Sequence, residues 1–156
     1  LTELNGVMAN IGERMANEVS CAAAPFDFTR PVEERLLFPE VDVTDLPDTD
    51  AGRDAIVANI VYLHEHLLGE RLSESDPEIQ RTYALYEGVY RDGHDDLLSE
   101  DPEYSVALPS PCRASTDRIT GEELGDAALI DDPDYTVRAW MAVVTYLLGD
   151  HAFLYE

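Results

Sequence analysis

A histidine-rich triplet, His64-Glu65-His66, is the first candidate for a metal-binding or catalytic site. In zinc proteases, two histidines four residues apart share one helix face, and a glutamate stands beside the first. Histidines two residues apart diverge by about 200° on a helix, so they cannot bind one metal ion together. The apolar residues around His64 predict a buried, hydrogen-bonded imidazole, whereas His66 is predicted on the polar side.

Clustered carboxylates are the second candidate, because calcium prefers oxygen ligands. The acids of one segment loosely resemble a calcium loop: Asp45, Asp48, Asp50 and Asp54. Their spacing departs from the EF-hand pattern, no glutamate closes the loop at its twelfth position, and Pro47 interrupts it. A calcium site and a solvated loop therefore remain the two interpretations of this segment.

A further cation candidate follows Gly93, where His94, Asp95 and Asp96 are predicted to lie in a turn. Imidazole and carboxylate groups are common metal ligands, so a turn of this composition could contribute to a cation site. The alternative interpretation is a solvated loop that holds no ion.

Other catalytic and cofactor signatures are absent from the sequence. It contains no Glu-x-x-His pair of a di-iron bundle, no Gly-x-Ser-x-Gly elbow, no phosphate loop, no dinucleotide fingerprint and no CxxCH haem attachment. Acidic pairs are so frequent that no single carboxylate dyad stands out as catalytic. We therefore predict no catalytic residue, no metal ligand set and no cofactor.

The two cysteines, Cys21 and Cys112, lie far apart, and neither belongs to a CxxC pair. This spacing excludes a thioredoxin-type motif and a four-cysteine zinc site. Two interpretations remain open. The cysteines form a disulfide if the protein is exported, or they are two buried free thiols.

The charge balance excludes several classes of partner. The 156 residues include 33 acidic and 10 basic ones, all of them arginine, for a formal net charge of -23. Such a surface repels nucleic-acid phosphates and anionic lipid heads, and no apolar run is long enough to cross a membrane. The acidic residues could attract cations or a basic protein partner. Alternatively, they keep the protein soluble or adapt it to a salty habitat.

Apolar residues recur at three- and four-residue steps, which predicts an all-α fold. The first helix is predicted over about 2–23, and Pro25 is predicted to end it. Its apolar stripe, predicted to face the core, comprises Leu4, Val7, Met8, Ile11, Met15 and Val19. A long irregular connection over 25–50 follows, and then a second helix over about 51–69 with Gly69 as its C-terminal cap.

Three later segments share an Asp-Pro start: Asp76-Pro77, Asp101-Pro102 and Asp132-Pro133. Asp caps a helix, and Pro suits the first helical position because it has no N–H group to leave unsatisfied. The first and third are predicted to begin long helices, the middle one a helix of one or two turns, and 121–130 a short helix. The chain is thus predicted to form one compact domain, 1–156, of about five helices.

Aromatic residues gather toward the C-terminal end: Tyr135, Trp140, Tyr146, Phe153 and Tyr155. If exposed, Tyr135, Trp140, Phe153 and Tyr155 would form a contact surface for a protein partner. The alternative is a core cluster, with the end of the chain folded back on the bundle.

Three segments carry a resemblance to known proteins: ANIVYLHEHLLGE (58–70), QRTYALY (80–86) and DYTVRAWMAVVTYLL (134–148). They resemble the C-terminal part of large, uncharacterised exported proteins of myxobacteria and their relatives. The resemblance implies an extracytoplasmic setting, in the periplasm, at the cell surface or secreted, and a module of a longer protein; a start at Leu1 agrees with this. Some such proteins have cytochrome-like regions upstream, which implies an accessory role in electron transfer.

Together these observations predict a non-catalytic helical module that acts in assembly or protein binding within an exported or cell-surface protein. The first alternative is a calcium-binding domain that uses loop carboxylates. The second is an accessory domain of an electron-transfer protein, and the last is a hydrolase that uses carboxylates.

Overall fold

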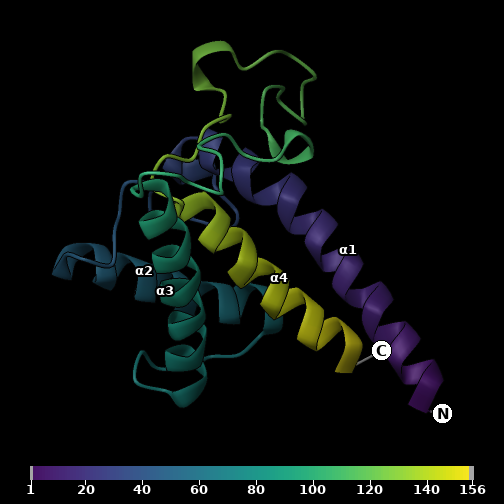
Figure 1. Cartoon of the computed structure of the whole chain (residues 1–156). Coiled ribbons are helices and arrows are strands. Elements are labelled where there is room, and N and C mark those ends of the chain that lie inside the picture. The colour runs from purple at the N-terminus through teal and green to yellow at the C-terminus, as the bar shows by residue number, and fades with distance from the viewer. Residues whose placement is uncertain (1, 155–156) are drawn as a thin grey trace.

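A computed structural model describes the backbone of residues 2–154 and the side chains of residues 12–149. The described chain contains four α-helices. They are α1 (Thr2–Thr29), α2 (Asp50–Leu68), α3 (Pro77–Leu97) and α4 (Thr136–Leu154) (Figure 1). Across residues 2–154, β pairing is limited to three isolated bridges. The all-α prediction is confirmed, but the described chain has four long helices where about five are predicted.

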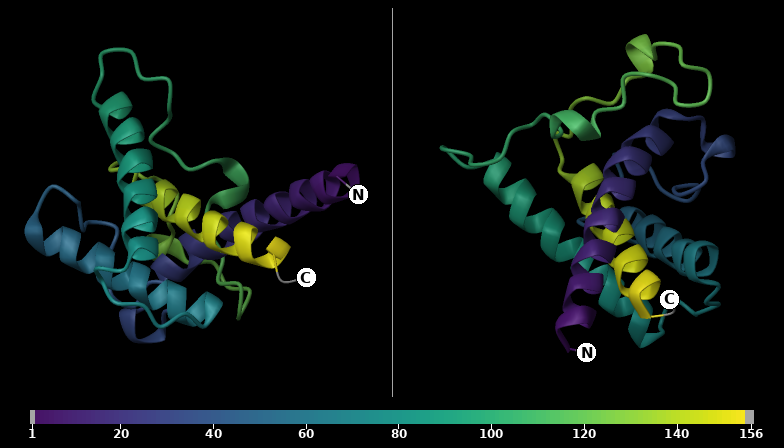
Figure 2. Two further views of the ribbon diagram at one scale, coloured as in Figure 1. Left: turned by 90° about the horizontal axis from the view of Figure 1, so that it is seen from below. Right: turned by 90° about the vertical axis from the view of Figure 1, so that its right-hand side faces the viewer.

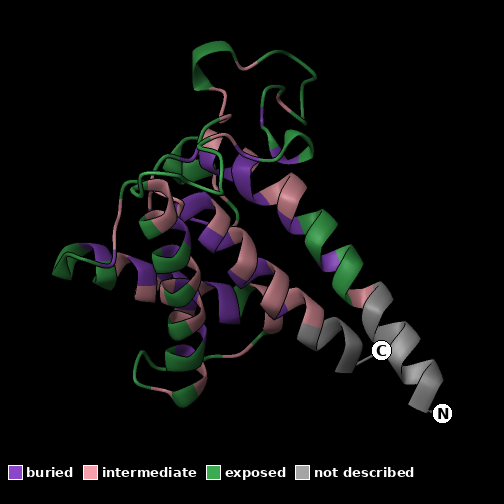
Figure 3. Cartoon of the chain, in the orientation of Figure 1, coloured by how far each residue is buried: buried purple, intermediate pink, exposed green. Residues whose placement is uncertain are grey.

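The core forms where α2, α3 and α4 meet the segment that follows α1. Trp140 of α4 has its ring 4.7 Å from that of Tyr86 on α3 and 5.4 Å from that of Phe38. Aliphatic side chains of α2 belong to the same buried cluster: Ile56, Ile60 and Leu63. Figure 3 shows these buried segments in purple. Burial of this apolar surface is the main stabilising contribution.

Helices α1 and α4 run antiparallel and pack side by side, as the views in Figures 1 and 2 show. The residues of α1 that are buried here are small and recur every four residues: Ala16, Ser20 and Ala24. Opposite Ala16 stands Gly149, where an added Cβ atom would lie 3.7 Å from the Ala16 Cβ atom. Small side chains let two helix axes approach closely.

The predicted core-facing stripe of α1 is wrong in the part that the structure describes. Met15 is 60% exposed and Val19 is 48% exposed. The small side chains of the same helix lie against α4 instead, because they permit the closer packing. The remaining members of the predicted stripe have side chains outside the described residues: Leu4, Val7, Met8 and Ile11.

Pro25 does not end α1, which continues to Thr29. Tertiary contacts of the last turn outweigh the hydrogen bond that proline removes. The ring of Phe28 stacks on that of Phe38 with 4.1 Å between centroids. The buried carboxylate of Asp27 accepts the backbone N–H groups of three consecutive residues, 36–38, at 2.8–3.0 Å.

The connection from Arg30 to Thr49 is irregular apart from one 3-10 turn, η1 (Val32–Glu34). The Arg35 guanidinium orders it by donating to backbone carbonyl groups and by an ion pair with Asp42 at 2.9 Å. Asn59 of α2 donates to the Leu37 carbonyl at 3.0 Å and accepts from the Glu40 N–H group at 3.1 Å. These bonds fix the connection against the core.

The end of α2 and the start of α3 have the capping residues that the sequence predicts. Gly69 has a left-handed backbone, with φ at 69°, and its N–H group closes α2. Asp76 caps α3 by accepting the Glu78 N–H group at 2.9 Å, and Pro77 occupies the first turn. The turn predicted at 93–96 is wrong, because α3 continues to Leu97.

The other two Asp-Pro starts behave differently. No helix follows Asp101-Pro102, and α4 begins only at Thr136, after a positive φ of 65° at Tyr135. The Asp132 carboxylate nevertheless accepts the N–H groups of Val137 and Arg138 in the first turn, at 3.1 and 3.0 Å. Asp132 therefore caps α4 from a distance, across the bend at Tyr135.

We call the segment between α3 and α4, residues 98–135, the lobe; its green part lies at the top of Figure 1. Two single 3-10 turns interrupt it, η2 (Ser110–Cys112) and η3 (Gly125–Ala127), and η3 takes the place of the short helix predicted over 121–130. The isolated bridges that pair Ala107 with Asp131 and Ala114 with Leu129 close the lobe.

Candidate functional site

The four acids of the predicted calcium loop do not converge. Asp48 is engaged by the Tyr90 hydroxyl at 3.1 Å and by the Arg91 guanidinium at 3.0 Å. The hydrogen bond from Arg91 lowers the pKa of this carboxyl. Asp45 accepts the Asp42 N–H group at 2.8 Å, whereas Asp50 and Asp54 lie on α2.

The second predicted cation group lies in the last turns of α3. His94 stacks on Tyr90, with 4.9 Å between ring centroids, and its Nδ1 atom is 3.3 Å from the Asp134 carbonyl oxygen. Asp96 accepts the backbone N–H groups of residues 103 and 104 at 3.1 and 2.8 Å, and Asp95 is exposed. His94 and Asp96 thus hold the lobe onto α3. Among the residues that the structure describes, no three His, Cys, Asp or Glu side chains are arranged to hold a metal ion.

His64 is buried, as predicted, and forms a polar cluster that the sequence does not reveal. Its Nε2 atom lies 2.9 Å from the Thr82 Oγ1 atom, and its Nδ1 atom lies 3.1 Å from a carboxylate oxygen of Glu70. The second histidine of the triplet, His66, is exposed and stacks on Tyr62. The only sequence signal for the cluster is the position of His64 in an apolar row.

The connectivity Thr82–His64–Glu70 matches that of a nucleophile, a base and an orienting carboxylate. Burial argues against that chemistry, because Thr82 is 0% exposed and a substrate carbonyl group cannot reach its hydroxyl. The Thr82 hydroxyl also donates to the Glu78 carbonyl oxygen at 3.0 Å. The arrangement satisfies polar groups that α2 and α3 bury between them.

Of the predicted aromatic surface, Trp140 is 0% exposed and belongs to the core. Its place against Tyr86 and Phe38 supports the core alternative for this residue. Tyr135 is half-buried, with the Arg138 guanidinium 4.0 Å from its ring centroid and its ring close to Gly93. Phe153 and Tyr155 lie outside the residues whose side chains are described.

The outward side of α1 carries two exposed apolar side chains. We call it the α1 face and define it by Met15 and Val19, which lie one helical turn apart and are largely exposed. Figure 3 shows this part of α1 in green. Three exposed charged residues accompany them on the helix: Glu13, Arg14 and Glu18. The sequence contains this pattern, but the pattern alone does not say which helix side is left without a neighbour.

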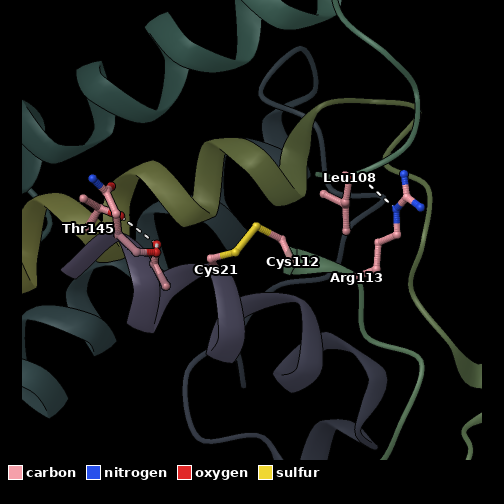
Figure 4. The surroundings of a disulfide bond; sticks show 7 residues. Cys21, Leu108, Cys112, Arg113 and Thr145 are labelled. Carbon is pink, nitrogen blue, oxygen red and sulfur yellow. Dashed lines mark hydrogen bonds between the residues drawn. A yellow bond between two sulfur atoms is a disulfide. The ribbon is translucent and has the colours of Figure 1, made fainter. Parts of the chain in front are cut away.

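A disulfide and a hydrogen bond hold α1 against the lobe and against α4. Cys21 and Cys112 form a disulfide that joins α1 to the lobe across 91 residues of sequence (Figure 4). One residue earlier, the Ser20 hydroxyl oxygen lies 2.7 Å from that of Thr145 on α4. On the lobe side, Arg113 donates to the Leu108 carbonyl oxygen at 2.9 Å. These contacts hold α1 in one orientation and so keep the α1 face turned outward.

Comparison with protein-family models, curated proteins and solved structures finds no match to this chain. The resemblance to exported myxobacterial proteins stays a prediction. None of the described helices is both long and apolar enough to span a membrane.

Proposed function

We propose that this chain is a non-catalytic helical module of an exported or cell-surface protein and that the α1 face binds a protein partner. The observation that carries the proposal is the exposure of Met15 and Val19 on a helix whose other side is fixed to α4 and the lobe. Adjacent apolar side chains on a rigid helix are a common docking element.

Two further observations support the proposal. Three of the titratable groups singled out in the sequence have structural partners: Asp48, His64 and Asp96. The disulfide is compatible with an oxidising, extracytoplasmic compartment. Assembly or partner binding is therefore favoured over catalysis.

The test compares two double variants with equal changes in charge. Met15→Glu with Val19→Glu places two carboxylates on the α1 face. Val106→Glu with Ile119→Glu places two on exposed positions of the lobe, where the wild-type residues are 45% and 67% exposed. Each protein is used as bait in extract of the source cells, and captured proteins are identified and then tested again as purified components.

We expect a purified partner that binds the wild type and the lobe variant but loses at least about tenfold in affinity, or 1.4 kcal/mol, for the α1 variant. Circular dichroism melting of all three proteins confirms that each is folded. Equal binding of the partner to the α1 variant and the wild type contradicts the proposal.

A further inference from the structure

We infer that the cluster of His64, Thr82 and Glu70 is a proton switch within the contact between α2 and α3. When the His64 ring takes up a second proton, at Nε2, the Thr82 hydroxyl group turns from the ring to the Glu78 carbonyl oxygen. This inference goes beyond the proposed function and does not depend on the α1 face.

Glu70 places the first proton of the ring. One of its carboxylate oxygens lies 3.1 Å from the His64 Nδ1 atom, and an ionised carboxylate can only accept a hydrogen bond. An Nδ1 atom without a proton would point its lone pair at that oxygen. The Nδ1 atom therefore carries a proton whether the ring is neutral or charged, because the partner of a ring nitrogen sets the tautomer.

The Thr82 hydroxyl group responds to the second proton. Its Oγ1 atom lies 2.9 Å from the His64 Nε2 atom and 3.0 Å from the Glu78 carbonyl oxygen, and a hydroxyl group has one hydrogen to donate. In the neutral ring, Nε2 has no proton and accepts the hydroxyl hydrogen. In the charged ring, Nε2 donates to Oγ1, and the hydroxyl hydrogen goes to the carbonyl oxygen.

Both arrangements leave the buried polar groups with partners. In each, the two ring nitrogens and the hydroxyl hydrogen of Thr82 are bonded, as buried polar groups require. In the neutral state the Glu78 carbonyl oxygen still accepts a backbone N–H group within α3, because it lies in the regular helix. Uptake of a proton from solvent therefore needs the rotation of one hydroxyl group and no separation of the helices.

The carboxylate of Glu70 balances the charge that the ring gains. The His64 side chain is 2% exposed and that of Glu70 is 35% exposed, so the anion stays in reach of water while it pairs with a buried cation. The adjoining carboxylates of α2 and α3, those of Glu65 and Glu78, pair with arginine side chains. Among the described residues, Glu70 is the ionisable side chain that is bonded to the ring.

The experiment follows the ring nitrogens by NMR in full-length protein with ¹⁵N-labelled histidine. The pH is varied over about 5 to 8, the range in which histidine changes charge. Nitrogen chemical shifts distinguish the two neutral tautomers from the charged ring. We expect neutral His64 to carry its proton at least about tenfold more often on Nδ1 than on Nε2, because the other tautomer leaves a buried contact unmade.

A pair of charge-matched variants tests the role of Glu70. Glu70→Gln should lower the preference for Nδ1 at least about tenfold, because an amide group can donate to Nδ1 as well as accept from it. Glu65→Gln removes the same charge from an exposed position next to His64 and should leave the preference unchanged.

A third variant tests the hydroxyl group. Thr82→Val keeps nearly the same volume but removes the acceptor of the Nε2 proton. The proton affinity of His64 should fall at least about threefold, since a hydrogen bond from a charged donor is stronger than one from a neutral donor. The exposed His66, observed in the same spectra, is the internal control and should keep its proton affinity. Circular dichroism melting confirms that each variant is folded.

Three outcomes overturn the inference. Neutral wild-type His64 with its proton on Nε2 would mean that Glu70 does not place the first proton, and this measurement needs no variant. A ring that keeps one charge state over the whole pH range would mean that no switch operates there. Equal proton affinity of His64 in folded Thr82→Val and in the wild type would mean that the hydroxyl group takes no part.

Discussion

The hydroxyl oxygens of Ser20 on α1 and Thr145 on α4 lie 2.7 Å apart at the centre of a helix pair. Ser20 is buried, and it stands between Ala16 and Ala24 in the row of small residues that faces α4. This bond joins two segments that are 125 positions apart in sequence. This bond helps to explain why α1 packs its small residues against α4 and leaves the larger Met15 and Val19 exposed.

Replacement of Ser20 tests whether close approach or the hydrogen bond matters more. Ser20→Ala should lower the free energy of unfolding by about 1 kcal/mol, the usual contribution of one hydrogen bond. Ser20→Leu should lower it further, by about 1–3 kcal/mol, because the larger side chain forces the helices apart. Urea denaturation measures both. A leucine variant as stable as the wild type would contradict the packing described for α1 and α4.

The Asp27 carboxylate should be a second sensitive position. From the end of α1 it accepts the backbone N–H groups of residues 36–38, of which that of Phe38 is buried and the other two are part-buried, so Asp27→Ala leaves these donors without an acceptor. We expect a loss of about 3 kcal/mol or more in unfolding free energy. Glu33→Gln, at an exposed site of the same connection, serves as the control and should change the unfolding free energy by less than about 0.5 kcal/mol.

Loss of the disulfide should destabilise the protein, because the bond restricts the unfolded chain across 91 residues. The expected cost is about 2–5 kcal/mol. Thermal melting with and without reductant measures it, and the Cys21→Ala, Cys112→Ala double variant should match the reduced wild type. Reductant should leave the melting of that variant unchanged. A reduced wild type that melts at the oxidised midpoint would show that the lobe does not depend on this bond.

The sequence predicts well those features that depend on residues close to one another in the chain. The cap at Asp76 and the left-handed glycine at Gly69 depend on groups within one helical turn, so their residue types are enough to place them. The burial of His64 follows in the same way from its place in an apolar row.

What the sequence does not predict depends on contacts between distant segments. Apolar spacing identifies an apolar side of α1, but the choice of small residues as the packed side requires α4 to be in place. Asp27 caps nothing in its own helix and instead accepts N–H groups 9–11 positions later. The partners of His64 are less evident: Thr82 reaches it only after α2 and α3 pack together. Glu70 reaches it through the turn that closes α2, where the Glu70 N–H group donates to the His64 carbonyl oxygen.

Alkaline pH should destabilise the protein through Tyr90. Burial, together with the negative charge of Asp48, raises the pKa of this phenol to about 12, above its ordinary value of about 10. Between these values the unfolded chain loses a proton that the folded chain retains, so stability present below about pH 10 falls as the pH rises. Melting curves from pH 8 to about 12 measure the loss, and Tyr90→Phe should show a smaller dependence on pH over that range.

Calcium should leave the melting midpoint unchanged. Any ion that binds the folded state alone raises the free energy of unfolding by an amount that grows with the logarithm of its concentration above Kd, and the candidate carboxylates do not converge on one point. Asp48 already pairs with Arg91, and Asp96 accepts two backbone N–H groups of the lobe. Melting in millimolar calcium and in excess chelator at equal ionic strength measures the difference. A midpoint several degrees higher with calcium, lost in Asp48→Asn or Asp96→Asn, would restore the calcium-binding alternative, because only an ion held at those carboxylates would respond to either change.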